Sequence, residues 1–305
     1  MARARRQRVV AAGLVVLAVS CTSAGGSSPT SRAHTGIVIA SFNFPESVVL
    51  AEIYGGALRS AGYRISVLHD VGPREVVDPA LSRGLVDMVP EYSGSALLFF
   101  SLGAVSGTAE SRPTHRALAR ATAPRGLVAL SPAPAQDANA IVVTKDTAAR
   151  YGLRATSDLA PVSSQLTFGG PEECPQRPLC LRGLRRIYGL DFKEFVPLDT
   201  GGPLTLQALV TGEIDVGLLF TTDPAIVSRH LVALRDDRGL QPAENVTPLI
   251  RHAVVARYGT RPAELIDRVS ARLRTGDVRA LDARVALGED PSAIAAQWLA
   301  AQGMG

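Results

Sequence analysis

A nine-residue pattern that occurs twice constrains the fold of this chain more than any other feature. The two copies are Ala80-Leu-Ser-Arg-Gly-Leu-Val-Asp-Met88 and Ala208-Leu-Val-Thr-Gly-Glu-Ile-Asp-Val216. Each copy predicts a helix end, a Gly that stops the helix, a short buried strand, and then a polar, turn-rich loop, at 89–94 and 217–223. In open α/β sheets, ligands bind at the loops that follow the carboxyl ends of strands. The two loops therefore predict two similar lobes that face one ligand across a cleft.

Residues 1–20 are predicted to be an export signal and not part of the fold. Four Arg side chains within the first eight residues precede an apolar stretch from Val9 to Val19, which is too short to span a bilayer stably. Ser20 and Cys21 follow, and this arrangement resembles a bacterial lipoprotein signal, in which the Cys carries the lipid. The alternative is ordinary secretory cleavage near Ala24. Both interpretations place the protein outside the cytoplasm.

The remaining cysteines agree with export from the cytoplasm, and the charge limits the classes of partner. Cys174 and Cys180 lie in a Pro-rich loop, where an oxidising compartment favours a disulfide. No metal site is expected there, since the loop holds two sulfurs and no nearby His. The four leader arginines account for the formal net charge of +4, so the mature chain is close to neutral and nucleic acid is not a predicted partner. The mature chain of about 280 residues is long enough for one large or two medium cores.

Strands and helices alternate along the chain, which predicts α/β sheets with parallel strands. The predicted strands are 37–40, 65–68, 140–144, 165–168 and 194–198, and the predicted helices are 45–61, 75–83, 115–121, 181–188 and 204–210. In the tail, Asp290 is a candidate N-cap with Pro291 in the first turn. Ile294 and Trp298 are four residues apart on one apolar face, so we expect both to pack in the core.

Several motifs in the same order resemble the substrate-binding proteins of osmoprotectant ABC importers, which take up glycine betaine, choline, carnitine or proline betaine. The matching stretches are Ile39-Ala-Ser-Phe-Asn-Phe-Pro-Glu46, Ala51-Glu-Ile-Tyr54, Arg74-Glu-Val-Val77, Pro90-Glu-Tyr-Ser-Gly-Ser95, Leu166-Thr-Phe-Gly-Gly-Pro-Glu172, Gln176-Arg-Pro178, Pro197-Leu-Asp199, Gly212-Glu-Ile-Asp-Val216 and Thr221-Thr-Asp-Pro224. The resemblance implies a type II periplasmic-binding-protein fold: two α/β lobes, a ligand cleft, and two crossing hinge segments.

The resemblance also implies a domain organisation and partners. After a signal peptide at 1–20 and a flexible tether at 21–35, we expect lobe I at 36–136 and 241–305 and lobe II at 137–240. The implied partners are a small-molecule solute and the permease and ATPase subunits of an ABC importer. A lipid on Cys21 would hold the protein, as a monomer without a cofactor, at the outer face of the cytoplasmic membrane.

The family's aromatic cage supplies the candidate ligand-binding residues. A quaternary ammonium cannot donate a hydrogen bond, so aromatic faces bind it by cation–π attraction. Tyr92 and Phe220 match cage positions, while Ser95 and Arg177 match residues that contact the ligand carboxylate. Three residues depart from the family pattern: Phe42 replaces a usual Lys, and Asn139 and Glu244 replace usual aromatics. The remaining candidates are Asn43, Ser93, Asp137 and Thr221.

Structural roles are the alternative for many of these residues. One of Phe42 and Phe44 is expected in the core. Tyr92 could pack, Arg177 could cap a helix, and Glu244 could pair with a cation or be solvated. We expect Glu91 to be structural, Asp199 and Asp223 to fix a turn and a cap, and the repeated acids Asp87 and Asp215 to play one architectural role twice.

The incomplete cage leaves the ligand open between two classes. A betaine-class osmolyte is the family default, while a flatter aromatic or polyhydroxy, polyphenol-like molecule is the alternative. A ligand-sensing envelope lipoprotein on the same fold is a further possibility. An enzyme is not predicted, because the chain lacks a nucleophile elbow, a His-based metal motif and a phosphate loop.

Overall fold

The computed structural model of the chain describes residues 36–304. The predicted signal peptide, the lipidation site Cys21 and the tether up to residue 35 lie outside the described residues. Within the described range, no helix combines the length and apolar character needed to cross a membrane.

The first sheet has five strands in the order β2-β1-β3-β10-β4. Their bounds are β1 Ile37–Ala40, β2 Ile65–Leu68, β3 Met88–Tyr92, β4 Leu127–Ala129 and β10 Val246–Arg251. Strand β1 is parallel to β2 and β3, and β10 is antiparallel to β3 and β4. Strand β10 lies between β3 and β4 but comes from far along the chain. This arrangement is expected of a lobe that is built from two separate segments.

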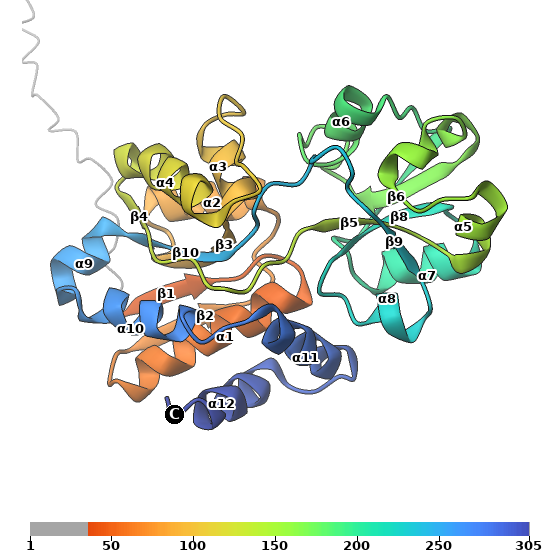
Figure 1. The fold of residues 1–305 in the computed structure, drawn as a ribbon. Coiled ribbons are helices and arrows are strands. Elements are labelled where there is room, and N and C mark those ends of the chain that lie inside the picture. Colours follow the sequence, from red (N-terminus) through yellow and green to blue (C-terminus); the bar gives the residue numbers. More distant parts are fainter. Residues whose placement is uncertain (1–35, 305) are drawn as a thin grey trace, which may run out of the picture. The chain divides into compact units, whose positions relative to one another are not determined.

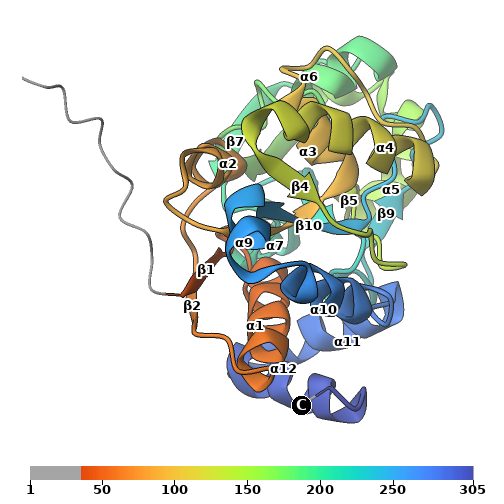
Figure 2. The same ribbon diagram turned by 90° about the vertical axis from the view of Figure 1, so that its left-hand side faces the viewer.

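Helices on both sides cover this sheet (Figure 1). They are α1 Pro45–Ser60, α2 Arg74–Arg83, α3 Ser93–Phe100, α4 Ser111–Thr122, η1 Ala123–Arg125, α9 His252–Tyr258, α10 Arg261–Ser270, α11 Thr275–Ala286 and α12 Pro291–Ala301. Helix α1 packs against α10, α11 and α12, as the turned view in Figure 2 shows. The predicted start of α12 is confirmed, since the Asp290 side chain accepts a hydrogen bond from Ala293 N. Ile294 and Trp298 are buried as expected.

The second sheet also has five strands, in the order β7-β6-β8-β5-β9. Its strands are β5 Asn139–Val143, β6 Thr167–Pro171, β7 Glu194–Leu198, β8 Val216–Phe220 and β9 Val232–Leu234. Its helices are α5 Lys145–Tyr151, η2 Thr156–Leu159, η3 Ser163–Gln165, α6 Leu181–Gly183, η4 Leu184–Tyr188, α7 Pro203–Thr211 and α8 Ala225–Ser228. Strand β6 is parallel to β7 and β8, whereas β5 is antiparallel to β8 and β9. The two sheets repeat one plan, which confirms the predicted two-lobed α/β fold.

Two segments cross between the sheets and are hydrogen-bonded to each other. The chain leaves β4 for β5 and returns from β9 to β10. Asp137 N donates to Glu244 O at 3.0 Å, and Gln136 and Asn245 form an antiparallel bridge. Side chains on these crossing segments are therefore placed between the lobes. The lobe boundaries proposed at residues 137 and 241 stay a prediction.

The repeated acids play one role twice, as predicted. Asp87 N donates to Val38 O at 2.7 Å, and the Asp87 carboxylate accepts from Val38 N at 3.0 Å. Asp215 does the same with Thr167, at 3.0 and 2.9 Å. Each acid therefore fixes the start of the neighbouring strand.

The predicted extent of the two repeat strands was wrong. The strands begin at Met88 and Val216, where the expected strands ended, and they run to Tyr92 and Phe220. Residues 89–92 and 217–220 of the segments predicted as loops are in fact paired: β3 with β10 over its whole length, and β8 with β5. Pairing with strands distant in sequence satisfies their backbone groups, and the local turn signals did not reveal it.

Candidate ligand-binding site

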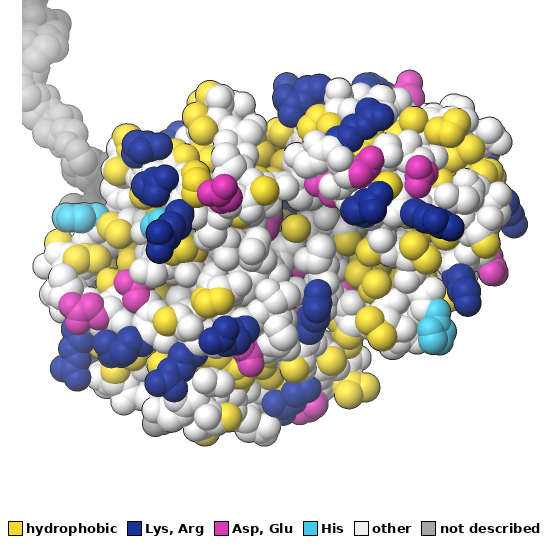
Figure 3. Space-filling view, viewed as in Figure 1, with side chains coloured by type: hydrophobic (Ala, Val, Ile, Leu, Met, Phe, Trp, Pro, Cys, Tyr) yellow, Lys and Arg dark blue, Asp and Glu magenta, His cyan; other side chains and the backbone are white. Residues whose placement is uncertain are grey.

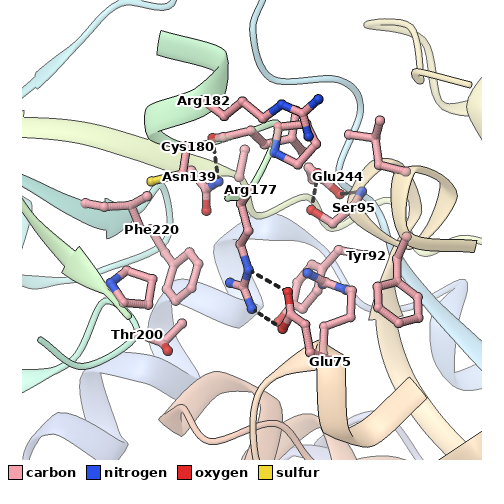
Figure 4. Close-up of a pocket in the computed structure, with 18 of the residues that line it drawn as sticks. Glu75, Tyr92, Ser95, Asn139, Arg177, Cys180, Arg182, Thr200, Phe220 and Glu244 are labelled. Carbon is pink, nitrogen blue, oxygen red and sulfur yellow. Dashed lines mark hydrogen bonds and ion pairs between the residues drawn. The ribbon is translucent and has the colours of Figure 1, made fainter. Parts of the chain in front are cut away.

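A cavity of about 310 Å³ lies between the two lobes (Figure 4). This volume is at the lower end of the range of about 300 to 1,000 Å³ found for ligand pockets, which suits a small solute. Residues of both lobes and of both crossing segments form the cavity wall. They are Phe44, Arg74, Glu75, Tyr92, Ser95, Leu98, Phe99, Leu102, Gly103, Asp137, Ala138, Asn139, Pro171, Arg177, Pro178, Leu179, Cys180, Arg182, Thr200, Leu218, Phe220 and Glu244.

The face drawn in Figure 3 shows no patch of charge of a single sign that could serve as a second candidate site. Lys and Arg side chains are spread over both lobes and interspersed with Asp and Glu. The balance agrees with the near-neutral charge expected of the mature chain. We therefore take the interlobe cavity as the candidate site.

Three aromatic rings from both lobes meet in the cavity wall. The ring of Phe44 lies 6.1 Å from that of Tyr92 and 5.0 Å from that of Phe220, measured between centroids. Phe44 immediately precedes α1, Tyr92 ends β3, and Phe220 ends β8. The carboxyl ends of the repeat strands thus bring two rings to one place, as the repeat pattern indicated.

Phe44, and not Phe42, stands in the cavity wall. Phe42 is only 2% exposed and stacks behind Phe44 with ring centroids 5.9 Å apart. Its other neighbour is Arg74, whose guanidinium carbon lies 5.2 Å from the ring centroid. The structure therefore replaces Phe42 by Phe44 as the ligand-facing ring. The backbone bends at residues 43 and 44, between β1 and α1, and this bend places the Phe42 ring behind that of Phe44.

Three other sequence candidates lie outside the cavity wall. Asn43 is exposed. Ser93 is buried, and its hydroxyl bonds Thr247 Oγ1 at 2.6 Å. Thr221 donates from its hydroxyl to Asp137 Oδ1 at 2.9 Å. Ser93 therefore ties the start of α3 to β10, and Thr221 positions Asp137 without lining the cavity itself.

Glu244 is buried in the wall and caps helix α3. Its Oε2 accepts hydrogen bonds from Gly94 N and Ser95 N, both at 3.0 Å, and its Oε1 accepts from Ser95 Oγ at 2.7 Å. Burial raises the pKa of Glu244 to about 7, although the Ser95 hydrogen bonds and the charge of Arg74 oppose the rise. The carboxyl is 3% exposed as a residue, so the solvated alternative is excluded.

Two arginines of the wall already hold carboxylate partners. Arg74 makes two hydrogen bonds to Glu91, from Nε at 2.6 Å and from Nη2 at 3.0 Å, which confirms the structural role expected of Glu91. Arg177 in lobe II does the same to Glu75 in lobe I, at 3.2 and 2.8 Å. Although partial burial raises the pKa of Glu75, the hydrogen bonds and charge of Arg177 bring it below its ordinary value. The Arg177–Glu75 pair, drawn with dashed lines in Figure 4, therefore joins the two lobes within the cavity wall.

The loop that carries Arg177 is closed by a disulfide. Cys174 and Cys180 are bonded, with their Cα atoms 5.2 Å apart. Within the ring, Arg177 N donates to Glu173 O and Cys174 O, both at 3.2 Å. A short covalent ring limits the conformations open to this loop and so helps to fix the Arg177 backbone.

A group of buried carboxyls beneath Tyr92 was missed by the sequence analysis. Glu46 accepts from the Tyr92 hydroxyl at 2.5 Å and from Thr222 Oγ1 at 2.7 Å. Burial, then the charge of Asp282, raises the pKa of Glu46 well above its ordinary value. Burial and the neighbouring Asp137 likewise raise the pKa of Asp282 to about 8. These acids come from α1, a crossing segment and α11, so no local motif could have grouped them.

Comparisons with known proteins settle the family. The model for the substrate-binding domain of the ABC-type glycine betaine transport system matches residues 35–301. The chain belongs to this family. It is 28% identical to a glycine-betaine-binding protein of Pseudomonas aeruginosa over 84% of each chain. It is 26% identical to the glycine betaine-binding protein YehZ of Escherichia coli K12, over 85% of this chain and 88% of YehZ.

The fold comparison agrees. A crystal structure titled glycine betaine/carnitine/choline ABC transporter superposes with a TM-score of 0.68 at 20% identity, over 88% of this chain and 99% of that one. The predicted family and fold are therefore confirmed. The chain is a substrate-binding component of an ABC importer and not an enzyme. Proteins of this kind bind small solutes outside the cytoplasm and deliver them to a membrane permease.

Proposed function

We propose that this protein binds a small quaternary ammonium solute of the betaine, choline and carnitine class in the interlobe cavity. The observation that carries the proposal is the meeting of the Phe44, Tyr92 and Phe220 rings in a cavity of about 310 Å³. Ring faces attract a methylated ammonium most strongly where water is excluded. The names of the relatives support the same class of solute.

Binding is coupled to closure of the lobes in this proposal. Phe44 and Tyr92 belong to the first lobe and Phe220 to the second, so a solute that touches all three rings makes its full set of contacts only when the lobes are together. Such a ligand shifts the population toward the closed state. The permease then distinguishes loaded from empty protein by shape.

We also propose that the protein is a lipid-anchored monomer on the outer face of the cytoplasmic membrane. The support is the leader sequence, in which Cys21 follows an apolar stretch, and the Ser- and Gly-rich segment after it. A tether of this composition behaves as a flexible coil and raises the effective concentration of the protein near its permease. Loss of membrane association after Cys21→Ser, measured by cell fractionation, would support the anchor.

The test of the proposed function is a ligand screen of the purified protein by thermal shift and calorimetry. The screen contains glycine betaine, choline, carnitine and a flat phenolic compound. A ligand at 100 times its Kd stabilises the folded state by about 2.7 kcal/mol, which corresponds to a rise in Tm of several degrees. Stabilisation by the phenolic compound alone would contradict the proposal and favour the alternative ligand class.

Paired variants connect the binding to the cavity. Phe44→Leu removes a ring from the wall and is expected to weaken binding about tenfold, since a cation–π contact contributes roughly 0.5 to 2 kcal/mol. Leu287→Ala is the control, because Leu287 is 82% exposed and lies outside the cavity wall. Equal affinities of the two variants would show that the solute binds elsewhere.

A further inference from the structure

The first turn of α3 is an anion-binding helix end that faces the cavity. Helix α3 begins at Ser93, directly after Tyr92 ends β3. The backbone N–H groups of a first helical turn have no partner within the helix, and the helix dipole adds partial positive charge there. Ser95 and Glu244 both line the cavity, so this helix end forms part of its wall.

The chain fills this anion site with a carboxylate of its own. Glu244 accepts from two backbone N–H groups, Gly94 N and Ser95 N, and from the Ser95 hydroxyl, and the last bond is drawn in Figure 4. Glu244 arrives from the crossing segment that returns from the second lobe. The three donors that would otherwise be offered to a solute carboxylate are therefore occupied.

We propose that Glu244 determines specificity by occupying the anion-binding end of α3, so that the cavity selects a cationic solute with a neutral hydroxyl in place of a carboxylate. This inference rests on the proposed function, because it narrows the solute class of the same site. A quaternary amino alcohol such as choline fits it, whereas a zwitterion such as glycine betaine does not.

The other charges of the wall favour the same class. A solute carboxylate would need an arginine, but Arg74 is held by Glu91 and Arg177 by Glu75. Binding to either one requires that an existing pair be broken. The ionised form of Glu244, which prevails above its pKa of about 7, also repels the incoming charge. A cation meets no such cost, since the carboxylates of Glu75 and Glu244 line the cavity.

Asp137 supplies a second reason to expect a hydroxyl. Its Oδ1 accepts from Thr221 Oγ1 at 2.9 Å and from Thr222 N at 3.0 Å. Its Oδ2 has no hydrogen-bond partner within residues 36–304, although Asp137 is only 4% exposed and lines the cavity. A buried oxygen without a partner costs free energy, and a hydroxyl of the solute would satisfy it.

The test compares choline and glycine betaine, which differ in the group opposite the ammonium, by calorimetry on the wild-type protein and on Glu244→Ala. We expect the wild type to bind choline at least tenfold more tightly than glycine betaine. Glu244→Ala opens the three donors to a solute carboxylate and removes the like charge. We therefore expect it to lower the choline-to-betaine affinity ratio at least tenfold. Glu213→Ala, which removes an exposed acid outside the cavity wall, should leave the ratio unchanged.

Two further arms separate the possible failures. Glu244→Gln keeps the shape of the side chain and should also reduce the preference for choline, so it replaces Glu244→Ala if that variant fails to fold. Preference of the wild type for glycine betaine, or an equal loss of both affinities in the folded Glu244 variants, would overturn the inference and leave the proposed function standing. Binding of neither compound, nor of carnitine, would overturn the proposed function and the inference with it.

Discussion

The two copies of the repeat begin alike and end differently. In both, a Gly in the left-handed conformation ends the helix, Gly84 with φ 77° and Gly212 with φ 79°. In both, an Asp then ties the start of the next strand to its neighbour. The first strand ends at Tyr92 and leads directly into the eight-residue helix α3, whereas the second ends at Phe220 and leads into Thr221, Thr222 and the four-residue helix α8.

The part that the two copies share builds the sheets, and the part in which they differ builds the binding site. The start that both copies share builds a sheet and does not line the interlobe cavity. The ends supply a ring each, but only the first copy adds a helix end that binds an anion. Glu46 then joins the two copies, since its carboxyl accepts from Tyr92 after the first strand and from Thr222 after the second.

The largest expected effect comes from the repeated acids. Asp87 is buried and also pairs with Arg251 at 3.2 Å, whereas Asp215 is half-buried and bonds Thr167. Asp87→Ala leaves Arg251 without this partner and should lower the free energy of unfolding by about 2 to 4 kcal/mol. Asp215→Ala should lower it by about 1 to 2 kcal/mol. Urea denaturation of both variants measures these changes.

Ligand affinity is the control for this pair. Neither acid lines the cavity, so the folded variants should bind the solute as the wild type does. Equal losses of stability would contradict the expectation that Asp87 contributes more than Asp215. A large loss of affinity in either variant would contradict the purely architectural role of that acid.

The next effect concerns Asp282, whose charge acts on Glu46, the residue that joins the two copies. The pKa of Asp282 is raised from 3.8 to about 8 by burial and by Asp137, and Asp223 acts in the same direction. The folded state therefore holds this proton more tightly than the unfolded state. The stability that the proton confers is full below about pH 4 and is lost as the pH rises through about 8.

Asp282→Asn should flatten this pH dependence. Within the window, the wild type loses at most about 1.4 kcal/mol per pH unit through this group. The variant should therefore gain Tm relative to the wild type between pH 6 and 9, with Glu46 and Asp137 carrying the remaining slope. Parallel Tm curves for the two proteins would show that Asp282 does not titrate in this range.

The smallest effects compare the two rings. Phe220→Leu removes the ring that the second copy supplies and should weaken solute binding by about 2- to 30-fold. Tyr92→Phe keeps the ring of the first copy and removes only the hydrogen bond to Glu46. We expect its affinity to stay within about threefold and its stability to fall by about 0.5 to 1.5 kcal/mol. A larger affinity loss in Tyr92→Phe than in Phe220→Leu would show that the Tyr92 hydroxyl contributes more to solute binding than the Phe220 ring does.

Local sequence patterns predicted much of the fold. Glycine stops, strand composition and the Asp290 cap depend on neighbouring residues, so they were visible in the chain itself. The matching roles of Asp87 and Asp215 followed from their equal positions in the two copies. The ends of β3 and β8 were not visible, because pairing with β10 and β5 extends them.

The site was predictable only in outline. Tyr92, Ser95, Asp137, Asn139, Arg177, Phe220 and Glu244 all line the cavity. Their partners were not foreseen, because Glu75 meets Arg177 from the other lobe and Glu244 meets Ser95 from 149 residues away. Phe42 and Phe44 have the same side chain two residues apart, so only the course of the backbone decides which ring faces the ligand.

The most direct test of the account is a crystal structure of the protein with choline. We expect the ammonium nitrogen within about 6 Å of the centroids of Phe44, Tyr92 and Phe220, with the hydroxyl directed at Asp137 or Glu244. Choline bound outside the interlobe cavity, or inside it with the ammonium turned away from these rings, would contradict the account.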